Sequence, residues 1–470
     1  MSEDLRTRVD DHSLEPVPEA DRKTWLSLTW NTAGIVTTLV ILFFGALVCF
    51  VAGVKIALIA GTVAFIFGSL IGWGLSHIAY DTGFSNTLIT RQYGLGIKGS
   101  TLASVIFSFL IIGMLALENA LLYRGILFYF QLADSVTMRI LIYGGLTLAW
   151  ILVTTFGFEL IARFSSIMLI AFLLVLAWIM TDILLQAASS LTDAVVFSSQ
   201  LPPEALSGMG ITSDWEKFVF SLNILIGPAC ALPLVAVDYG RYARSTGHAT
   251  AAVIIGSLFQ SVIVMLVGGV LMYAAAEGLS AHFIETQGLS VEAARQMVLN
   301  SPDSIAAAFM VFGGGIGFLL MIVAQSKAQV LNCYSASLSL ANLFDAASRW
   351  RPGRFFFVIV ANIIALAMLY GHLLELVEAW ISLLGVLLST LSGVILIDYF
   401  VTTPILRRRS SEPLPQQSVN WAGVITVCVS VVAAHYILPS VIAIEVITSC
   451  LVVVLLYPAL RLTVFNPAKA

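Results

Sequence analysis

Long apolar runs alternate with short polar segments along the whole chain. Many of the runs exceed 18 residues, the length at which an apolar helix is able to cross a bilayer. We predict twelve spans, at residues 25–50, 54–79, 101–130, 138–157, 165–187, 216–237, 250–276, 314–343, 355–371, 379–401, 420–438 and 440–460. The pattern therefore predicts an all-α integral membrane protein.

Composition agrees with this pattern. Of the 470 residues, 59% are hydrophobic and 11% are charged, and the mean hydropathy is +0.97. A soluble domain has no means of burying so much apolar surface. The five cysteines lack the spacing of metal ligands, so we expect no metal site and no cofactor.

The positive charges lie mainly in alternate connections between the spans. If the N-terminus is cytoplasmic, 17 of the 23 Lys and Arg residues fall inside and four fall outside. Cytoplasmic loops carry such an excess of positive charge. We therefore expect a multi-pass protein of the plasma (inner) membrane with both termini in the cytoplasm. An odd number of spans would no longer place most of these Lys and Arg residues on one side of the membrane, so the distribution supports twelve.

Two charges fall inside predicted spans. Lys327 lies near the middle of the eighth span, where a lysine costs about 2.5–3.5 kcal/mol on insertion scales, so it marks a functional site by default. Glu118 lies beyond the middle of the third span and must be protonated, paired or solvated. Lys327 is its candidate partner.

The sixth span contains proline at two positions, Pro228 and Pro233. Proline removes an amide donor and clashes with the preceding turn, so we predict a break between residues 227 and 233, with a simple kink as the alternative. In the first span Gly34 and Gly45 are a weaker sign of a break. Broken helices near the midplane often mark a transport site.

The polar residues of the two longer outside connections predict structural elements and not binding sites. Residues 213–216, Ser-Asp-Trp-Glu, have the spacing of a capping box and predict the start of the sixth span. Residues 292–295 predict a short surface helix.

Five segments carry a resemblance to a known family. They are PVPEADRKTWLSLTW, TGFSNTLITRQYGLGIKGS, VDYGRYARS, LSGVILIDYF and QQSVNWAGV, in this order. With them the chain resembles the nucleobase:cation symporters, which include the cytosine permeases and the hydantoin, allantoin and uracil carriers. The resemblance covers nearly the whole chain.

The resemblance implies two inverted five-helix repeats with discontinuous helices one and six, followed by two peripheral helices. Substrate would lie between spans one, three, six and eight, and alternating access would move it across the membrane. The implied parts are an N-terminal cytoplasmic tail (1–22), a first repeat (23–187), an outside connection (188–215), a second repeat (216–401), a cytoplasmic linker (402–419) and two peripheral helices with the C-terminal tail (420–470).

The same resemblance implies the substrate site. Met114 takes the position where relatives stack an aromatic side chain on the substrate ring, and Glu118 takes the position of an amide that hydrogen-bonds it. A nucleobase or related small heterocycle is therefore the leading substrate class. The candidate substrate-binding residues are Thr37, Thr38, Gly113, Met114, Glu118, Gly227, Pro228, Ala229, Ala231 and Gln329.

The sodium site of relatives falls here on Ala324, Lys327 and Ala328. Two alanines and a lysine make a poor sodium cage, because a hard cation needs several oxygen ligands. At ~4 Å an ammonium would repel sodium by about 4 kcal/mol in a medium of effective dielectric 20. The ammonium would instead replace the ion.

We therefore expect a sodium-independent importer that couples to protons through Lys327, with Glu118 assisting. The alternative is a permanently charged Lys327 that locks helices together in a uniporter or exchanger for a related solute, such as an amino acid or a vitamin precursor. The chain has no H-E-x-x-H or G-x-S-x-G motif to favour an enzyme. We expect a bilayer setting, a small-molecule substrate and no nucleic-acid partner.

Overall fold

The computed structural model describes residues 17–156, 158–186, 196–299, 304–371, 373, 375–409 and 414–467. The predicted tail up to residue 16, residues 188–195 of the outside connection, residues 410–413 of the linker and residues 468–470 lie outside the described residues.

Every predicted span coincides with a helix or a group of consecutive helices. In chain order these are α2 (Trp25–Val36) with α3 (Leu39–Ala52), α4 (Val54–Thr82), α6 (Ser100–Tyr129), α7 (Val136–Phe156), α8 (Phe158–Gln186), α11 (Asp214–Gly240), α12 (Thr246–Leu258) with the π-helix η2 (Phe259–Val264) and α13 (Met265–Gln287), α15 (Ile305–Ser348), α16 (Arg354–Tyr370), α17 (Val377–Ile397), α19 (Trp421–Val431) with the π-helix η5 (Val432–Ile437), and α20 (Glu445–Leu462). Shorter elements connect them: η1 (Glu19–Asp21), α5 (Asn86–Gln92), α10 (Pro203–Gly208), α14 (Val291–Leu299), the π-helix η4 (Asp398–Thr402) and α18 (Thr403–Arg409).

The described helices establish a multi-pass membrane protein. Seven are long and apolar enough to cross a membrane, or nine if each of two bent pairs is one span. Three shorter apolar helices, within α8, α16 and α19–η5, coincide with the remaining predicted spans. The count of twelve crossings and the inverted repeats stay predictions.

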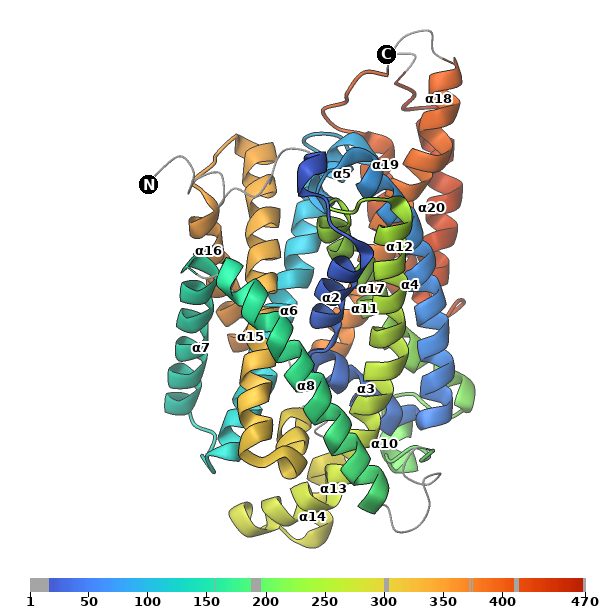
Figure 1. Ribbon diagram of the computed structural model, residues 1–470. Coiled ribbons are helices and arrows are strands. Elements are labelled where there is room, and N and C mark those ends of the chain that lie inside the picture. The colour runs from blue at the N-terminus through green and yellow to red at the C-terminus, as the bar shows by residue number, and fades with distance from the viewer. Residues whose placement is uncertain are drawn as a thin grey trace.

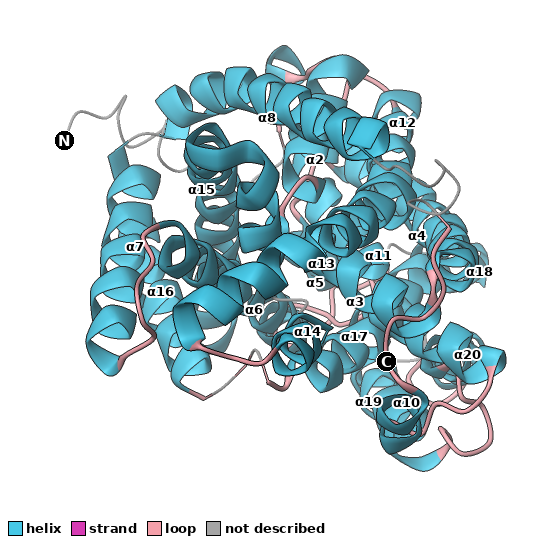
Figure 2. Ribbon diagram, turned by 90° about the horizontal axis from the view of Figure 1, so that it is seen from below, coloured by secondary structure: helices cyan, strands magenta, loops and turns pink. Residues whose placement is uncertain are grey.

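The helices form one bundle in which the last two lie at the edge. Figure 2 shows α19 and α20 beside α17, on the opposite side of the bundle from α7 and α16. The helix α8 crosses the face of the bundle at a steep tilt to α15 (Figure 1). The peripheral position of α19 and α20 agrees with the prediction for spans eleven and twelve.

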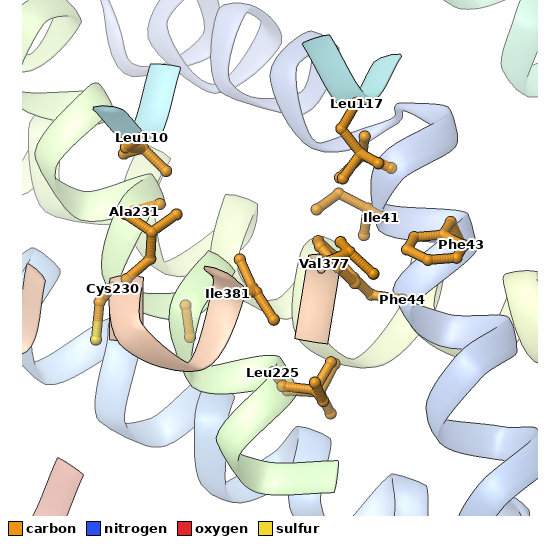
Figure 3. Close-up of a cluster of buried hydrophobic side chains, with 14 of the residues drawn as sticks. Ile41, Phe43, Phe44, Leu110, Leu117, Leu225, Cys230, Ala231, Val377 and Ile381 are labelled. Carbon is orange, nitrogen blue, oxygen red and sulfur yellow. The ribbon is translucent and has the colours of Figure 1, made fainter. Parts of the chain in front are cut away.

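A buried apolar core joins segments that are far apart in the sequence. Figure 3 shows side chains from four helices meeting there: Ile41, Phe43 and Phe44 of α3, Leu110 and Leu117 of α6, Leu225, Cys230 and Ala231 of α11, and Val377 and Ile381 of α17. The core also includes Leu39 and Val40, which directly follow the interruption of the first span.

The first span is discontinuous. Its helix ends at Val36 and starts again at Leu39, and the two halves are inclined by 58°. The eighth span is also bent. Gly314 of α15 has a backbone φ of 50°, which favours glycine, and the two parts of α15 are inclined by 67°.

The predicted break in the sixth span is wrong, because α11 runs unbroken through Pro228 and Pro233. Pro233 leaves the Ala229 carbonyl without its N–H donor, and that carbonyl faces α4, where a Cβ atom on Gly68 would lie 2.7 Å away. Close packing of neighbouring helices permits proline inside a membrane helix. The sixth span is therefore one continuous helix with two prolines inside it, and not a pair of half-helices.

Both predictions for the outside connections are confirmed. Ser213 and Glu216 form a reciprocal capping box at the start of α11: the Ser213 hydroxyl accepts from the Glu216 N–H at 3.3 Å, and the Glu216 carboxylate accepts from the Ser213 N–H at 2.9 Å. The predicted surface helix is α14.

The helices α3 and α13 cross each other at unusually close range. A Cβ atom on Gly268 would lie 2.1 Å from the Leu42 carbonyl oxygen, and one on Gly45 would lie 2.1 Å from that of Met265. Only glycine allows the two backbones to approach this closely. The crossing holds α3, the second half of the broken span, against the bundle.

We predict that Gly268→Ala lowers the free energy of unfolding by about 1–3 kcal/mol, because the added methyl group must push α3 away from α13. Thermal unfolding of the purified protein in detergent measures the change. The matched control is Gly144→Ala in α7, where a Cβ atom meets nothing within 4 Å. Alanine there should leave stability unchanged or raise it slightly. Equal losses in the two variants would contradict the prediction.

Candidate functional site

The candidate site forms around the break in the first span. Thr37 and Thr38 have non-helical backbone angles between α2 and α3. A helix end leaves carbonyl groups unpaired, and a helix start leaves N–H groups unpaired. The end of α2 therefore carries partial negative charge and the start of α3 partial positive charge, both inside the protein.

Glu118 of α6 caps the start of α3. Glu118 is 2% exposed, and its carboxylate interacts with the Thr38 hydroxyl and the Val40 N–H. In the amide orientation that satisfies both ends of its side chain, Gln325 of α15 donates to Glu118 Oε2 at 2.6 Å and accepts from the Leu39 N–H at 2.9 Å. A carboxylate and an amide from two other helices thus interact with the N–H groups at the start of α3 that have no partner within the helix.

Lys327 of α15 lies beside the last turn of α2. A Cβ atom on Gly34 would lie 2.2 Å from Lys327 Nζ, so the ammonium fills the space that Gly34 leaves open. The side chain is 7% exposed, and Nζ has no hydrogen-bond partner among the described residues. The negative end of α2 favours a cation at this place.

Glu118 and Lys327 do not form the ion pair that the sequence suggested. No ion pair joins them in the described part of the chain. Instead, each charge lies at the helix end of opposite sign, Glu118 at the start of α3 and Lys327 beside the end of α2. The break separates the two charges and places each beside a helix end of opposite partial charge.

A cavity of about 60 Å³ adjoins the break. It has room for roughly four to six water molecules, at about 10–15 Å³ each. Residues before and after the break in the first span line it, together with residues of α6, α11, η2 and α15. The lining residues are Ile35, Thr38, Val40, Ile41, Leu110, Ile111, Met114, Glu118, Pro228, Ala231, Leu232, Val235, Tyr239, Gln260, Ala328, Leu331, Asn332 and Ser335. The walls are mostly apolar, and a few polar groups converge on the space.

Three polar residues of this lining were missed by the sequence analysis. Gln260, Asn332 and Ser335 reach the cavity from η2 and α15, and the buried Gln260 Nε2 has no hydrogen-bond partner among the described residues. Gln260 belongs to a π-helical turn, a feature frequent at functional sites. The available signal was a polar residue inside an apolar run, which is common in membrane helices.

The cavity unites six of the predicted site residues. Thr38, Met114, Glu118, Pro228, Ala231 and Ala328 all line it. They come from spans one, three, six and eight, as the resemblance implied. The side chain of Ala324 lies outside the described part of the structure.

The other predicted substrate residues do not line the cavity. The Thr37 hydroxyl donates to the Ala33 carbonyl at 2.8 Å, and Ala229 faces α4. Gly113 is covered by the Trp380 indole of α17, 2.2 Å from where its Cβ atom would be. Gly227 lies against α17, where the Ile381 carbonyl would be 2.7 Å from an added Cβ atom.

Gln329 also points away from the cavity. Its amide donates to the Leu115 carbonyl at 3.2 Å and to Asn119 Oδ1 at 2.8 Å. Trp150 of α7 donates to the same Asn119 oxygen at 2.8 Å. Gln329 therefore joins α15 to α6 and α7 instead of facing a substrate.

The fold has counterparts among solved structures. Mhp1 in an inward-facing conformation matches with a TM-score of 0.70 and 15% identity over 96% of this chain and 93% of that chain. A Na⁺-coupled sialic acid symporter, in a substrate-bound outward-open state with a novel Na⁺ site, matches with a TM-score of 0.62 and 13% identity over 96% of this chain and 92% of that chain. No protein-family model and no curated protein sequence matches the chain.

At these identities the likeness establishes the fold. The structural neighbours are transporters and not enzymes. They are described in an inward-facing conformation and in a substrate-bound outward-open state. The chain therefore shares the fold of these proteins.

We predict that Gln325→Leu destabilises the protein by about 1–3 kcal/mol, because the change leaves the Leu39 N–H and one Glu118 oxygen buried without this partner. Thermal unfolding in detergent measures it. The control is Ser326→Ala, one residue further along α15, where the hydroxyl bonds only to the Ile322 carbonyl of its own helix. A Gln325→Leu protein as stable as the control would refute the capping role.

Proposed function

We propose that the chain is a secondary active transporter that imports a nucleobase or related small heterocycle by alternating access. It works without sodium and couples to protons through Lys327. The observation that carries the proposal is the position of Lys327, whose buried Nζ lies beside Gly34 at the broken first span without a hydrogen-bond partner among the described residues.

The lining of the cavity supports a small heterocycle as substrate. At about 60 Å³ the cavity is smaller than the roughly 150 Å³ that encloses a benzene ring, so a heterocycle requires the site to widen during alternating access, and a single-ring solute requires the least widening. Met114 and neighbouring aliphatic side chains offer apolar faces, and a thioether packs well against a ring. Gln260 and Asn332 offer amide groups, which are able to pair with the mixed donors and acceptors along the edge of a nucleobase.

Glu118 argues against a carboxylate-bearing substrate such as an amino acid. In transporters with broken helices, the start of a half-helix attracts an anionic group of the substrate. Here Glu118 already occupies the start of α3. A second carboxylate in the same cavity would meet like charge, so a neutral or positively charged solute fits better.

Lys327 supports independence from sodium. Its ammonium lies at the negative end of α2, where it supplies the positive charge that a bound cation would otherwise bring. Neighbouring Ala328 lines the cavity without an oxygen ligand. A sodium ion at this place would have no oxygen ligand from Lys327 or Ala328 and would face a like charge.

The isolation of Lys327 supports proton coupling over a permanent charge. A buried ammonium without a counter-charge is costly, and a lysine in such surroundings readily takes part in proton exchange. Lys327 would hold its proton while water reaches the site and release it in the other conformation. Glu118, which accepts from the Gln325 amide and interacts with the Thr38 hydroxyl and the Val40 N–H, would keep its place at α3 throughout.

We predict that proteoliposomes with the wild-type protein accumulate substrate about tenfold for each unit of pH gradient at zero membrane potential, since one pH unit is worth about 1.4 kcal/mol. External sodium at fixed pH should not change the uptake rate. Lys327→Gln should abolish accumulation while leaving equilibration down a substrate gradient. Uptake that rises with sodium, or pH-driven accumulation by Lys327→Gln, would overturn the coupling role.

Gly34→Ala tests the same contact without removing the amine. The added methyl group displaces the flexible end of Lys327, so we expect reduced pH-driven accumulation with little loss of stability. Gly144→Ala is again the control. Undiminished accumulation by Gly34→Ala would show that the position of Lys327 beside α2 does not matter for coupling.

A ligand screen tests the substrate class. Nucleobases, hydantoins, allantoin and pyrimidine precursors are compared for the rise in unfolding temperature that a specific ligand produces by mass action. We predict that Asn332→Leu weakens binding of the best ligand by about tenfold or more, as expected when one polar contact is lost. A screen in which only carboxylates stabilise the protein would contradict the proposed substrate class.

A further inference from the structure

A second and larger cavity lies at the end of the molecule where α5 and α18 are found (Figure 1). Its volume is about 440 Å³, within the range of roughly 300–1,000 Å³ that is usual for small-molecule sites. Its walls come from α5 and the loop after it, from η4 and α18, from the segment before α19, and from the end of α20. The proposed transport function leaves this cavity without a role.

The cavity is positively charged. Arg91, Arg407 and Arg461 line it, and Asp398 is the one carboxylate among the described lining residues. Asp398 is buried and engaged: it accepts from the Gly94 N–H at 2.7 Å and from the Thr402 and Thr403 hydroxyls, with Arg461 Nε 3.8 Å away. Among the described lining residues, three guanidinium groups therefore accompany one carboxylate, and Asp345, which lies outside the lining, pairs with Arg91 at 3.0 Å.

The three guanidinium groups have donors to spare. Arg461 uses one terminal nitrogen on the Gln417 side chain, and Arg407 bonds to the Tyr93 side chain. Arg91 bonds to Asn342 and Asp345. Each guanidinium has five N–H groups, and their planar fork matches two oxygens of a phosphate.

We infer that this cavity binds a phosphate-bearing anion, from the headgroup of an anionic lipid or from a free organic phosphate. Three arginines around one cavity with a single engaged carboxylate give the charge and the geometry for such a group. The amides of Gln92, Gln416 and Gln417 supply further polar contacts along the same walls.

The site is linked to the substrate cavity through α5. Arg91 Nε donates to Asn342 Oδ1 at 2.8 Å and its terminal nitrogen to Asp345 Oδ2 at 3.0 Å, at the end of the helix that carries Lys327. At the other end of α5, the Asn86 N–H donates to Asp238 Oδ1 of α11 at 2.8 Å. An anion that engages Arg91 competes with Asp345 and so alters the packing of α5 against a helix of the substrate site.

The test is binding to the purified full-length protein, with the unfolding temperature as readout. Inorganic phosphate and glycerol 1-phosphate probe the free anion, and vesicles of phosphatidylcholine with or without phosphatidylglycerol probe the headgroup. We expect at least one of these probes to raise the unfolding temperature. Whether the free phosphates or the vesicles do so identifies the source of the bound anion. Because the assay requires no transport, its failure is distinguishable from failure of the proposed function.

Arg407→Gln should weaken the binding by about tenfold or more, the effect of losing one charge-assisted contact. The matched control is Arg408→Gln, which removes a charge from the next residue of α18, exposed and outside the cavity lining. No stabilisation by any probe would overturn the inference. An equal effect of the two variants would also overturn it, because binding would then follow the general surface charge.

Discussion

The arrangement of the candidate substrate cavity depends on one constraint: the ends of two half-helices are buried at the break in the first span. Backbone groups in a membrane protein must find partners inside the protein. Here α6 supplies a carboxylate and α15 an amide for the start of α3, while Lys327 places a cation beside the end of α2. The cavity lies where these helices meet, so its polar character follows from the way the break is satisfied.

This constraint explains why the first span breaks and the sixth does not. Prolines in α11 remove two amide donors, yet tight contacts with α4 and α17 keep that helix intact. The first span contains no proline, but partners on other helices stabilise the unwound backbone at Thr37 and Thr38. Local helix-breaking tendency is therefore a weaker guide in a packed membrane bundle than the availability of partners for the freed groups.

The two buried charges also connect architecture with function. In a transporter whose substrate and ion are both charged, those ligands would neutralise the helix ends only when bound. With Glu118 and Lys327 in these places, each helix end has a side chain of opposite sign beside it in the empty protein. Under the proposed function, the substrate is then free to be uncharged, and a proton on one of the two groups is the charge that changes between the two conformations.

The sequence determined the membrane class, the position of each long apolar helix, the capping box of α11 and the two buried charges, because each of these follows from hydropathy or from spacing along one segment. It did not determine which helix faces point inward. The helices of the site carry apolar residues on all sides, and in α15 polar residues such as Gln325, Ser326 and Gln329 are interspersed among them, so no amphipathic stripe marks the inner face. Only the tertiary structure could therefore assign Gln260, Asn332 and Ser335 to the cavity, turn Gly227 and Gln329 away from it, and place Glu118 and Lys327 at opposite ends of a break instead of in one ion pair.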